Sequence, residues 1–418
     1  MMIRRFTYSA KNAAAIKEFL KKIDAFSAEV PASVIEITDA VREKGDAALI
    51  DYALKFDKAA IKSLKVAPDA VKKAYSLIDK SVIKSIKTAA KNISAFHKMQ
   101  KDNIKGYVFK NEGYSIEQKY VPLDSAGIYI PGGQAPLFST VLMAGIPAIT
   151  AGVKRICIVS PPRYNFEVNP YVLAAADIIG INEIYRSGGA QAIAALAYGT
   201  KTIPKVNKVV GPGNIYSTGA KKHLFGTIGI DSINGPSEVT IIADETARPE
   251  FVLADMAAQA EHINGHSVLI TVSEKLADFT QTGLKNMEKD MAVNAVIIKV
   301  KSLKEAAIIA NEKAPEHLTV ITKNDRAVIA MITNAPAIFA GNYSPVAFGD
   351  YVAGANHILP TNGTSKFFSG LSVLDFMKHT HIIRGTKKGM QKFGPAAEKM
   401  AETETLINHK KSIEIRRK

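Results

Sequence analysis

Short apolar runs rich in β-branched residues alternate with helical runs in two stretches of this 418-residue chain. The first stretch covers residues 127–214, and the second runs from Val239 to Tyr343. Alternation of this kind predicts parallel sheets with covering helices. We therefore predict an α/β fold with two Rossmann-like parallel-sheet domains and with helical N-terminal and C-terminal extensions.

Glycine-rich turns follow three of the apolar runs and open helices, at Pro131-Gly132-Gly133, Gly188-Gly189 and Gly211-Pro212-Gly213. Backbone N–H groups at helix starts bind phosphate well, and glycine allows close approach. None of the turns has the GxGxxG spacing, so each one taken alone is an ordinary βα turn. Three of them at one sheet edge favour a binding crevice there.

Apolar positions recur near helical period before and after these stretches, which predicts helices at both ends of the chain. Residues 1–25 are expected to form an N-terminal helical arm, and residues 372–418 a C-terminal helical extension. We assign residues 26–125 together with 237–371 to a first α/β domain, and residues 126–236 to a second.

Composition indicates a globular protein, because 47% of the residues are hydrophobic. The single cysteine, Cys157, excludes internal disulfides and lies in an apolar run that favours an inert core position. The most apolar run, residues 137–153, is broken by Pro147 and is too short to span a bilayer. No apolar signal core follows the N-terminus, so we expect a cytoplasmic protein with no membrane partner.

The chain is basic, with 54 Lys and Arg against 39 Asp and Glu, a formal net charge of +15. A nucleic-acid partner is one interpretation of such a charge. The lysines are dispersed along amphipathic helices, as in residues 72–98, and no zinc-finger or RNP-type pattern accompanies them. A solvated, lysine-rich surface is the better interpretation, so we predict no nucleic-acid partner.

Histidine is scarce, with nine residues in the chain, yet four of them lie in short segments that also carry carboxylates or amides. These segments are Gln259-Ala260-Glu261-His262, Pro315-Glu316-His317, Gly349-Asp350 with Asn356-His357, and Glu404 with His409. Nitrogen and oxygen ligands without thiolate indicate zinc or a similar divalent ion at an open, catalytic site.

Two of these segments have plainer interpretations when taken alone. Gln259 and His262 are three apart in an expected helix over residues 251–261 and would share a face, but the same pattern suits a helix cap. Glu316 and His317 are natural general acid–base groups, and a strand-entry pair held by local hydrogen bonds is about as good a description.

The remaining candidates are weaker by pattern. Asp350 suits a turn, and Ser237 precedes an apolar run without the Gly-x-Ser-x-Gly elbow of a nucleophile. Glu404 and His409 are five apart, so a regular helix would not align them. They would reach a site elsewhere in the chain or on a neighbouring subunit.

Taken together, strings of residues in the right order resemble the histidinol dehydrogenase family from about residue 30 to residue 412. The strings begin at Tyr129-Ile-Pro-Gly-Gly-Gln, Gly188-Gly-Ala-Gln, Gly211-Pro-Gly-Asn, Gly235-Pro-Ser-Glu, Gln259-Ala-Glu-His, Pro315-Glu-His-Leu and Asn356-His-Ile-Leu. Asn234 and Val346 depart from the family pattern, which usually has Ala and Glu there.

The resemblance implies oxidation of L-histidinol to L-histidine through bound L-histidinal, with two NAD and one Zn²⁺ per subunit. It implies zinc ligands at Gln259, His262, Asp350 and His409, the last from the partner subunit of a homodimer with shared active sites. The acid–base pair would be Glu316 and His317, and further contacts to L-histidinol would come from Ser237, His357 and Glu404. The NAD contacts would be Tyr129, Gln191 and Asn214.

Other functions stay open beside this one. A related zinc alcohol dehydrogenase could act on another small polyol or a sulfonated alcohol, although His357 and Glu404 argue for an imidazole-bearing substrate. A basic nucleic-acid-binding protein and an inactive structural partner are the alternatives from other classes. The intact Glu316 and His317 pair speaks against the inactive protein.

Overall fold

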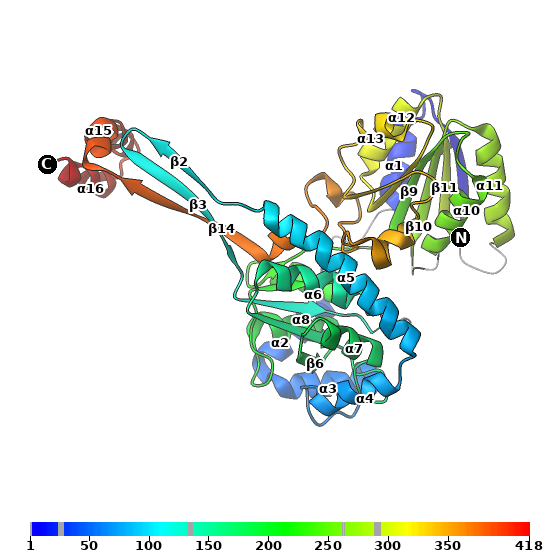
Figure 1. Ribbon diagram of the computed structural model, residues 1–418, viewed down its shortest axis with the longest axis horizontal. Coiled ribbons are helices and arrows are strands. Elements are labelled where there is room, and N and C mark those ends of the chain that lie inside the picture. The colour runs from blue at the N-terminus through cyan, green and yellow to red at the C-terminus, as the bar shows by residue number, and fades with distance from the viewer. Residues whose placement is uncertain (1, 24–28, 133–136, 261, 263, 288–293) are drawn as a thin grey trace.

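The computed structural model describes residues 2–23, 29–132, 137–260, 262, 264–287 and 294–418. Two parallel sheets covered by helices form the body of the molecule, and a narrow arm projects from it (Figure 1). The predicted α/β fold with two parallel-sheet units is confirmed. In the described ranges no helix combines the length and the apolar character needed to cross a bilayer.

The larger sheet has six strands in the order β1-β11-β10-β9-β12-β13, and all neighbours are parallel. The strands are β1 (Met2–Thr7), β9 (Glu238–Ala243), β10 (His266–Thr271), β11 (Asn294–Lys299), β12 (His317–Ile321) and β13 (Ala337–Ala340). One face packs against α10 (Pro249–Ala260) and α11 (Glu274–Met287), and the other against α1 (Ala13–Ile23), α12 (Leu303–Lys313) and α13 (Asp325–Ile329). Strands β9, β10 and β12 are buried at every position, as continuous apolar runs predict for a parallel sheet.

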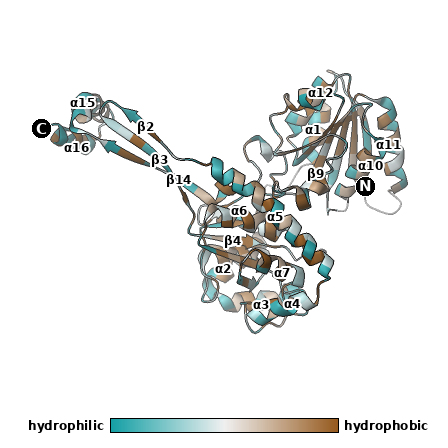
Figure 2. Ribbon diagram, viewed as in Figure 1, coloured by the Kyte–Doolittle hydropathy of each residue, from teal (hydrophilic) through white to brown (hydrophobic). Residues whose placement is uncertain are grey.

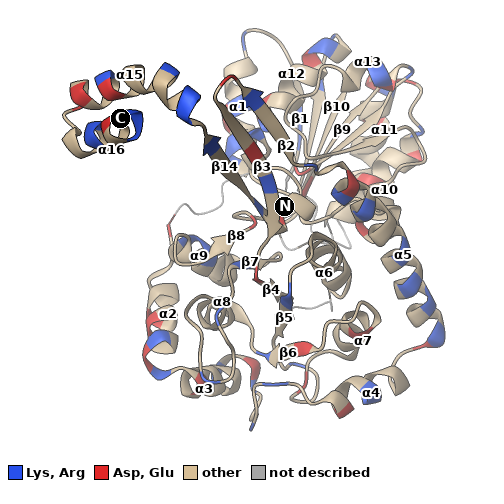
Figure 3. Ribbon diagram, turned by 60° about the vertical axis from the view of Figure 1, so that its left-hand side comes forward, with Lys and Arg blue, Asp and Glu red and all other residues tan. Residues whose placement is uncertain are grey.

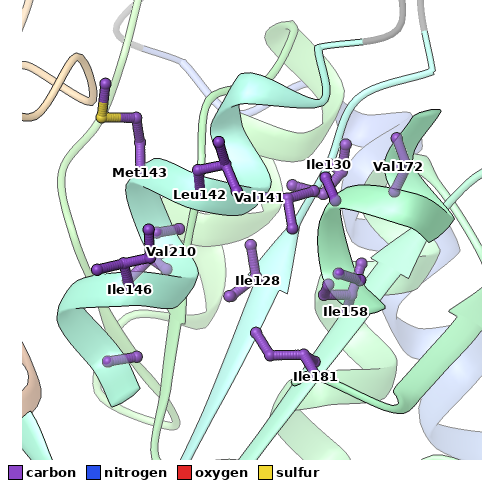
Figure 4. Packing of buried hydrophobic residues seen from close by; sticks show 14 of the residues in the cluster. Ile128, Ile130, Val141, Leu142, Met143, Ile146, Ile158, Val172, Ile181 and Val210 are labelled. Carbon is purple, nitrogen blue, oxygen red and sulfur yellow. The ribbon is translucent and has the colours of Figure 1, made fainter. Parts of the chain in front are cut away.

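The smaller sheet has five parallel strands in the order β6-β5-β4-β7-β8. They are β4 (Ser125–Tyr129), β5 (Arg155–Ser160), β6 (Glu183–Arg186), β7 (Lys208–Val210) and β8 (Gly229–Ile230). The crossover helices are α6 (Ser139–Ala151), α7 (Pro170–Ile178), α8 (Gly189–Tyr198) and α9 (Ile215–Leu224). Figure 4 shows the apolar core between these strands and α6 and α7, where Ile128 and Ile158 meet Val141 and Val172.

The helices that precede the smaller sheet in sequence pack on it, contrary to the predicted domain division. They are α2 (Ala32–Lys44), α3 (Asp46–Asp57), α4 (Pro68–Ser76) and α5 (Lys80–Asn103). Residues of α2 and α3 share a core with α8 and α9, while α5 packs with α6 and α7. Residues 32–103 therefore belong with the 126–236 unit rather than with residues 237–371, because their apolar faces are buried there.

The predicted N-terminal helical arm is also incomplete. Residues 2–7 form β1, which pairs in parallel with β11 at one edge of the larger sheet. Among the described residues of this region, residues 13–23 are helical, and Ile16 and Leu20 of that helix are buried in the core of the larger sheet. Residues 2–23 are thus part of the 237–371 unit, because β1 pairs with β11 and the apolar face of α1 packs against α12.

The projecting arm combines chain segments that lie far apart in sequence. Strand β3 (Tyr114–Pro122) pairs in antiparallel fashion with β2 (Tyr107–Asn111) and with β14 (Met377–Gly385), and α15 (Lys387–Thr403) and α16 (Ile407–Arg417) follow at the tip. The arm leaves the body at the level of the smaller sheet (Figure 1). The expectation of a purely helical C-terminal extension is wrong, because residues 377–385 complete this sheet.

Charge and hydropathy follow the fold. Apolar residues concentrate in the strands of both sheets, whereas hydrophilic residues recur along the outside of α5 (Figure 2). Basic residues are spread over several elements, α5 and the arm among them (Figure 3). Cys157 is fully buried, and burial raises the pKa of its thiol to about 12, which confirms the inert core position.

Candidate active site

Glu316 and His317 lie at the amino end of β12, directly after a turn that ends α12. Ala314 adopts a left-handed conformation with a φ of 54°, and Pro315 cannot continue a helix because it lacks an N–H group. The turn directs both side chains inward, where Glu316 is 6% exposed and His317 is 5% exposed. The predicted position between a helix and a strand is correct.

The main chain of Glu238, at the start of β9, binds both members of this pair. Its N–H donates to Oε2 of Glu316 at 2.9 Å, and Nδ1 of His317 lies 2.9 Å from its carbonyl oxygen. Because a carbonyl only accepts, Nδ1 must carry the proton, and Nε2 is the nitrogen that can exchange one. Within the described residues Nε2 has no hydrogen-bond partner, and it lies 3.6 Å from Oδ1 of Asp350.

The two side chains perturb each other's protonation. Burial raises the pKa of Glu316 to about 7, and the nearby His317 opposes that rise. Burial disfavours the charged form of His317, but the Glu316 and Asp350 carboxylates outweigh it and raise the pKa of His317 to about 9. His317 Nδ1 and Glu316 Oε2 are 3.4 Å apart, so the protonation of one group affects that of the other.

Asp350 and His357 approach the pair from a single irregular segment. Asp350 belongs to a short π-helical turn over Gly349–Ala353, and its carbonyl oxygen lies 2.9 Å from Nδ1 of His357. Nε2 of His357 lies 3.5 Å from Oγ1 of Thr140 in α6. These contacts connect the amino edge of the larger sheet to the carboxyl edge of the smaller one, so the site lies between the two units.

Gln259 and His262 lie at and just beyond the end of α10. Gln259 is 3% exposed, and within the described residues its Oε1 has no hydrogen-bond partner. The helix ends at Ala260, and the predicted end, Glu261, lies outside the described residues. His262 lies in the turn that follows, where its N–H donates to the Gln259 carbonyl at 3.3 Å, and its side chain is exposed whereas that of Gln259 is buried.

Ser237 is half-buried beside Glu238, and its carbonyl accepts from the N–H of His266 at 3.3 Å. Asn234, the residue that departs from the family pattern, is buried. Its Nδ2 donates to the Leu359 carbonyl at 2.8 Å, and its Oδ1 accepts from Ser232. The amide therefore ties the Gly235-Pro236-Ser237 turn to the segment behind His357.

The carboxyl edge of the smaller sheet carries the predicted NAD contacts. Tyr129 ends β4 and is buried, and its hydroxyl accepts from the N–H of Gly189 at 3.2 Å. Gln191 is buried in the first turn of α8. Asn214 caps α9 by accepting from the N–H groups of two following residues. The structure brings these three side chains to one edge, as predicted, whereas residues 133–136 of the first glycine turn lie outside the described ranges.

Glu404 and His409 are not near these residues. Both are exposed and lie at the tip of the arm, where Glu404 follows the last residue of α15 and His409 is in the first turn of α16. Figure 1 shows that tip well away from both sheets. The structure therefore does not bring them to the site of their own chain.

Sequence patterns did not single out the contacts around Glu238. Its side chain is fully buried with Lys313 and His266, although no spacing rule connects these three positions. The one available signal is a lysine at a helix end next to the proline-marked turn. Thr140 was missed as well, because it lies in the same apolar helix as many core residues.

Two α/β units, each with a parallel sheet, enclose a buried carboxylate–imidazole pair. This arrangement is that of an α/β enzyme whose candidate site lies between the two sheets. A family model for histidinol dehydrogenase matches residues 20–417. The chain is 44% identical to histidinol dehydrogenase of Clostridium acetobutylicum over 93% of both chains. It is 43% identical to that of Geobacillus kaustophilus, covering 95% of this chain and 96% of the relative.

A solved structure indicates the same family. The crystal structure of histidinol dehydrogenase from Elizabethkingia anophelis superposes with a TM-score of 0.91 at 37% identity, covering 99% of this chain and 97% of that one. The chain belongs to the histidinol dehydrogenase family, and it is an enzyme of that family.

Proposed function

We propose that this chain oxidises L-histidinol to L-histidine through bound L-histidinal, with two NAD and one zinc ion per subunit. The observation that carries the proposal is the buried pair of Glu316 and His317. Nε2 of His317 faces Asp350 and has no hydrogen-bond partner among the described residues. Family membership supports the substrate. The carboxylate and imidazole supply the acid–base chemistry that an alcohol-to-acid oxidation requires.

Gln259, His262 and Asp350 of one subunit, with His409 of the partner subunit, would hold the zinc. Oε1 of Gln259 fits such a role, because it is a buried oxygen without a hydrogen-bond partner in the described part of the chain. Within the described ranges of this chain, no group of three or more His, Cys, Asp or Glu side chains is placed to hold a metal ion by itself. When bound, the ion would fix the nitrogens of histidinol and orient its carbinol.

Tyr129, Gln191 and Asn214 would contact NAD at the carboxyl edge of the smaller sheet. Gly211 supports this placement, because its φ of 123° is left-handed and a Cβ there would overlap the Tyr129 carbonyl. Gly211 thus lets the turn between β7 and α9 lie directly against the main chain at the end of β4, beside Tyr129. NAD held there would supply the hydride acceptor for the carbinol carbon.

His317 and Glu316 divide the proton transfers. His317 Nε2 takes the hydroxyl proton of histidinol as the alcohol becomes the aldehyde. Glu316 takes a proton from water as the water oxygen adds to the aldehyde carbon, and His317 returns its proton to the carbonyl oxygen, which gives the hydrate. Glu316 then releases its proton to solvent. His317 then takes a hydroxyl proton of the hydrate as the acid forms, so two hydrides and one water balance the four-electron oxidation. Ser237, His357 and the partner subunit's Glu404 would hold the substrate.

The arm supports a homodimer with shared sites. Its strands and tip expose large apolar side chains, which cost free energy in water unless another surface covers them. They include Tyr107, Phe109, Ile383, Ile407 and Ile415. Since Glu404 and His409 lie at the tip of this arm, docking it on a second subunit would deliver both residues to that subunit's site.

The test measures NADH formation from L-histidinol before chelation, after chelation and after zinc is added back. We expect about two NADH per histidinol, loss of activity with the metal and its return with zinc. An enzyme that retains zinc but reduces NAD only with another alcohol would overturn the substrate. An enzyme that reduces no NAD with any alcohol would overturn the proposed reaction.

A further inference from the structure

A buried cluster of Glu238, Lys313 and His266 lies behind the acid–base pair. The Lys313 ammonium forms an ion pair with Oε2 of Glu238, and both side chains are fully buried. Nε2 of His266, at 5% side-chain exposure, lies 3.2 Å from the same oxygen and 3.2 Å from Nζ of Lys313. Burial opposes the charge on Glu238, but Lys313 and His266 lower the pKa of its carboxyl, so the carboxylate is ionised at neutral pH.

The cluster joins the elements from which the acid–base pair is built. Glu238 begins β9 and His266 begins β10, and the two are direct neighbours in the parallel register. Lys313 is the last residue of α12, three positions before Glu316. The ion pair therefore closes the turn through Ala314 and Pro315 against β9, which pairs with β12 on its other side.

Glu238 acts on the pair through its main chain while the cluster holds its side chain. Its N–H orients Oε2 of Glu316, and its carbonyl keeps the proton on Nδ1 of His317. A small shift of this one residue would misalign both side chains at once. Misplacement by about 1 Å costs about 100-fold in rate in other enzymes.

Stability alone does not explain these buried charges. Removing two ions from water is expensive, and well-packed apolar residues in their place are often neutral or stabilising. Oε1 of Glu238 is also buried without a hydrogen-bond partner among the described residues, which adds to the cost. The buried cluster costs stability, and the main chain of Glu238 contacts both Glu316 and His317. These two observations together point to a role for the cluster in the site.

We propose that Lys313 and His266 are positioning residues, which fix the main chain of Glu238 and through it the alignment of Glu316 and the protonated nitrogen of His317. This role rests on the proposed function of Glu316 and His317. Both side chains are buried, and the proposal gives neither of them a contact with the substrate.

The test is a double-mutant cycle on the full-length, zinc-loaded enzyme, with kcat, the KM values for histidinol and NAD, and Tm measured for each variant. Lys313→Met leaves the Glu238 carboxylate buried without its cation. We expect kcat to fall about 10- to 100-fold while both KM values stay within about 3-fold. Adding Glu238→Gln removes the stranded charge, so the double variant should recover kcat to within about 5-fold of the wild type.

Arg155→Met is the matched control. It breaks an ion pair with Glu183 at the amino edge of the smaller sheet, so it should lower Tm and leave kcat unchanged. If Lys313→Met lowers Tm but changes kcat less than about 2-fold, the cluster is structural only and the proposal is wrong. The proposal also fails if the double variant is as slow as Lys313→Met.

His266→Asn covers the case in which Lys313→Met does not fold. It removes one donor to Glu238 and keeps both ions, so we expect a smaller loss of kcat, about 3- to 10-fold, with unchanged KM values. A kcat within about 2-fold of the wild type would then overturn the proposal. A wild-type enzyme that makes no NADH from histidinol contradicts the proposed function itself, and the positioning role falls with it.

Discussion

The two sheets offer opposite edges to the site, and the edges differ in how they bind. The smaller sheet presents its carboxyl edge, where glycine turns lead into the first turns of α8 and α9. The larger sheet presents its amino edge, where Glu238, His266 and His317 are the first residues of three adjacent strands. The proposed function assigns the cofactor to the first edge and the acid–base chemistry of buried side chains to the second.

The difference teaches where a substitution should act. If the cofactor binds at the glycine edge as proposed, a change there should weaken its binding. If Nε2 of His317 transfers the proton as proposed, a change at the amino edge of the larger sheet should slow the chemical steps and leave binding almost intact. The variants below test this division.

His317→Asn should have the largest effect. The amide cannot take a proton at the position of Nε2, so we expect kcat to fall about 100- to 10,000-fold with little change in KM for NAD. Steady-state kinetics measure this split. His223→Asn, at an exposed site in α9, is the control and should retain wild-type rates. A larger change in the KM for NAD than in kcat would break the proposed division between the edges.

Mixing two inactive variants tests whether the arm of one subunit supplies His409 to the site of a second subunit. His317→Asn and His409→Asn homodimers should each be inactive. After dissociation and reassembly, each hybrid has one site with both histidines intact, so random mixing should restore about a quarter of wild-type activity. Recovery requires exchange of subunits, which mass spectrometry of the dimers can verify. If verified hybrids stay inactive, His409 acts within its own chain and does not complete the partner's site.

Gly211→Ala should affect the other edge. The added Cβ would meet the Tyr129 carbonyl, so the turn must open and the KM for NAD should rise about 10-fold or more, with a smaller change in kcat. Gly180→Ala is the matched control, because its φ of 80° is also left-handed but nothing lies within 4 Å of the added Cβ. Equal effects of the two substitutions on KM would mean that backbone strain, rather than close approach, explains the result.

Much of the fold was predictable, because buried parallel strands read as continuous apolar runs and the glycine turns mark their ends. The strands from Val239 to Tyr343 were found in this way. The packing of residues 32–103 was not, because amphipathic helices show which face is buried but not which sheet buries it. Strand β14 was missed for a related reason, since its exposed residues 378–381 alternate too little to separate it from a helix.

The residues of the candidate site also fall into those that the sequence predicted and those that it did not. Glu316, His317 and Asp350 follow turns with proline or glycine, and the structure brings them together. The cluster of Glu238, Lys313 and His266 depends on contacts between residues up to 75 positions apart, which no local pattern contains. The zinc ligands remain a prediction, since residue spacing cannot show that a distant tip, with His409, meets the pocket of another subunit.

The smallest expected effect concerns a histidine that supports the segment between the two edges. His97 in α5 is fully buried, its Nδ1 lies 2.8 Å from the Ile93 carbonyl, and its Nε2 lies 3.5 Å from Nδ2 of Asn356, next to His357. Burial lowers the pKa of His97 below its ordinary value of 6.5. The folded protein thus favours the neutral ring, while the unfolded chain binds a proton more readily.

Stability from His97 is therefore complete above pH 6.5 and is lost as the pH falls toward the lower pKa of the folded state. In His97→Gln, which cannot gain the proton, Tm should decline less between pH 7 and pH 5 than in the wild type, by a few degrees at most. His223→Gln, at an exposed site, should follow the wild-type curve. Parallel curves of Tm against pH for His97→Gln and the wild type would show that protonation of this ring does not contribute to the loss of stability at low pH.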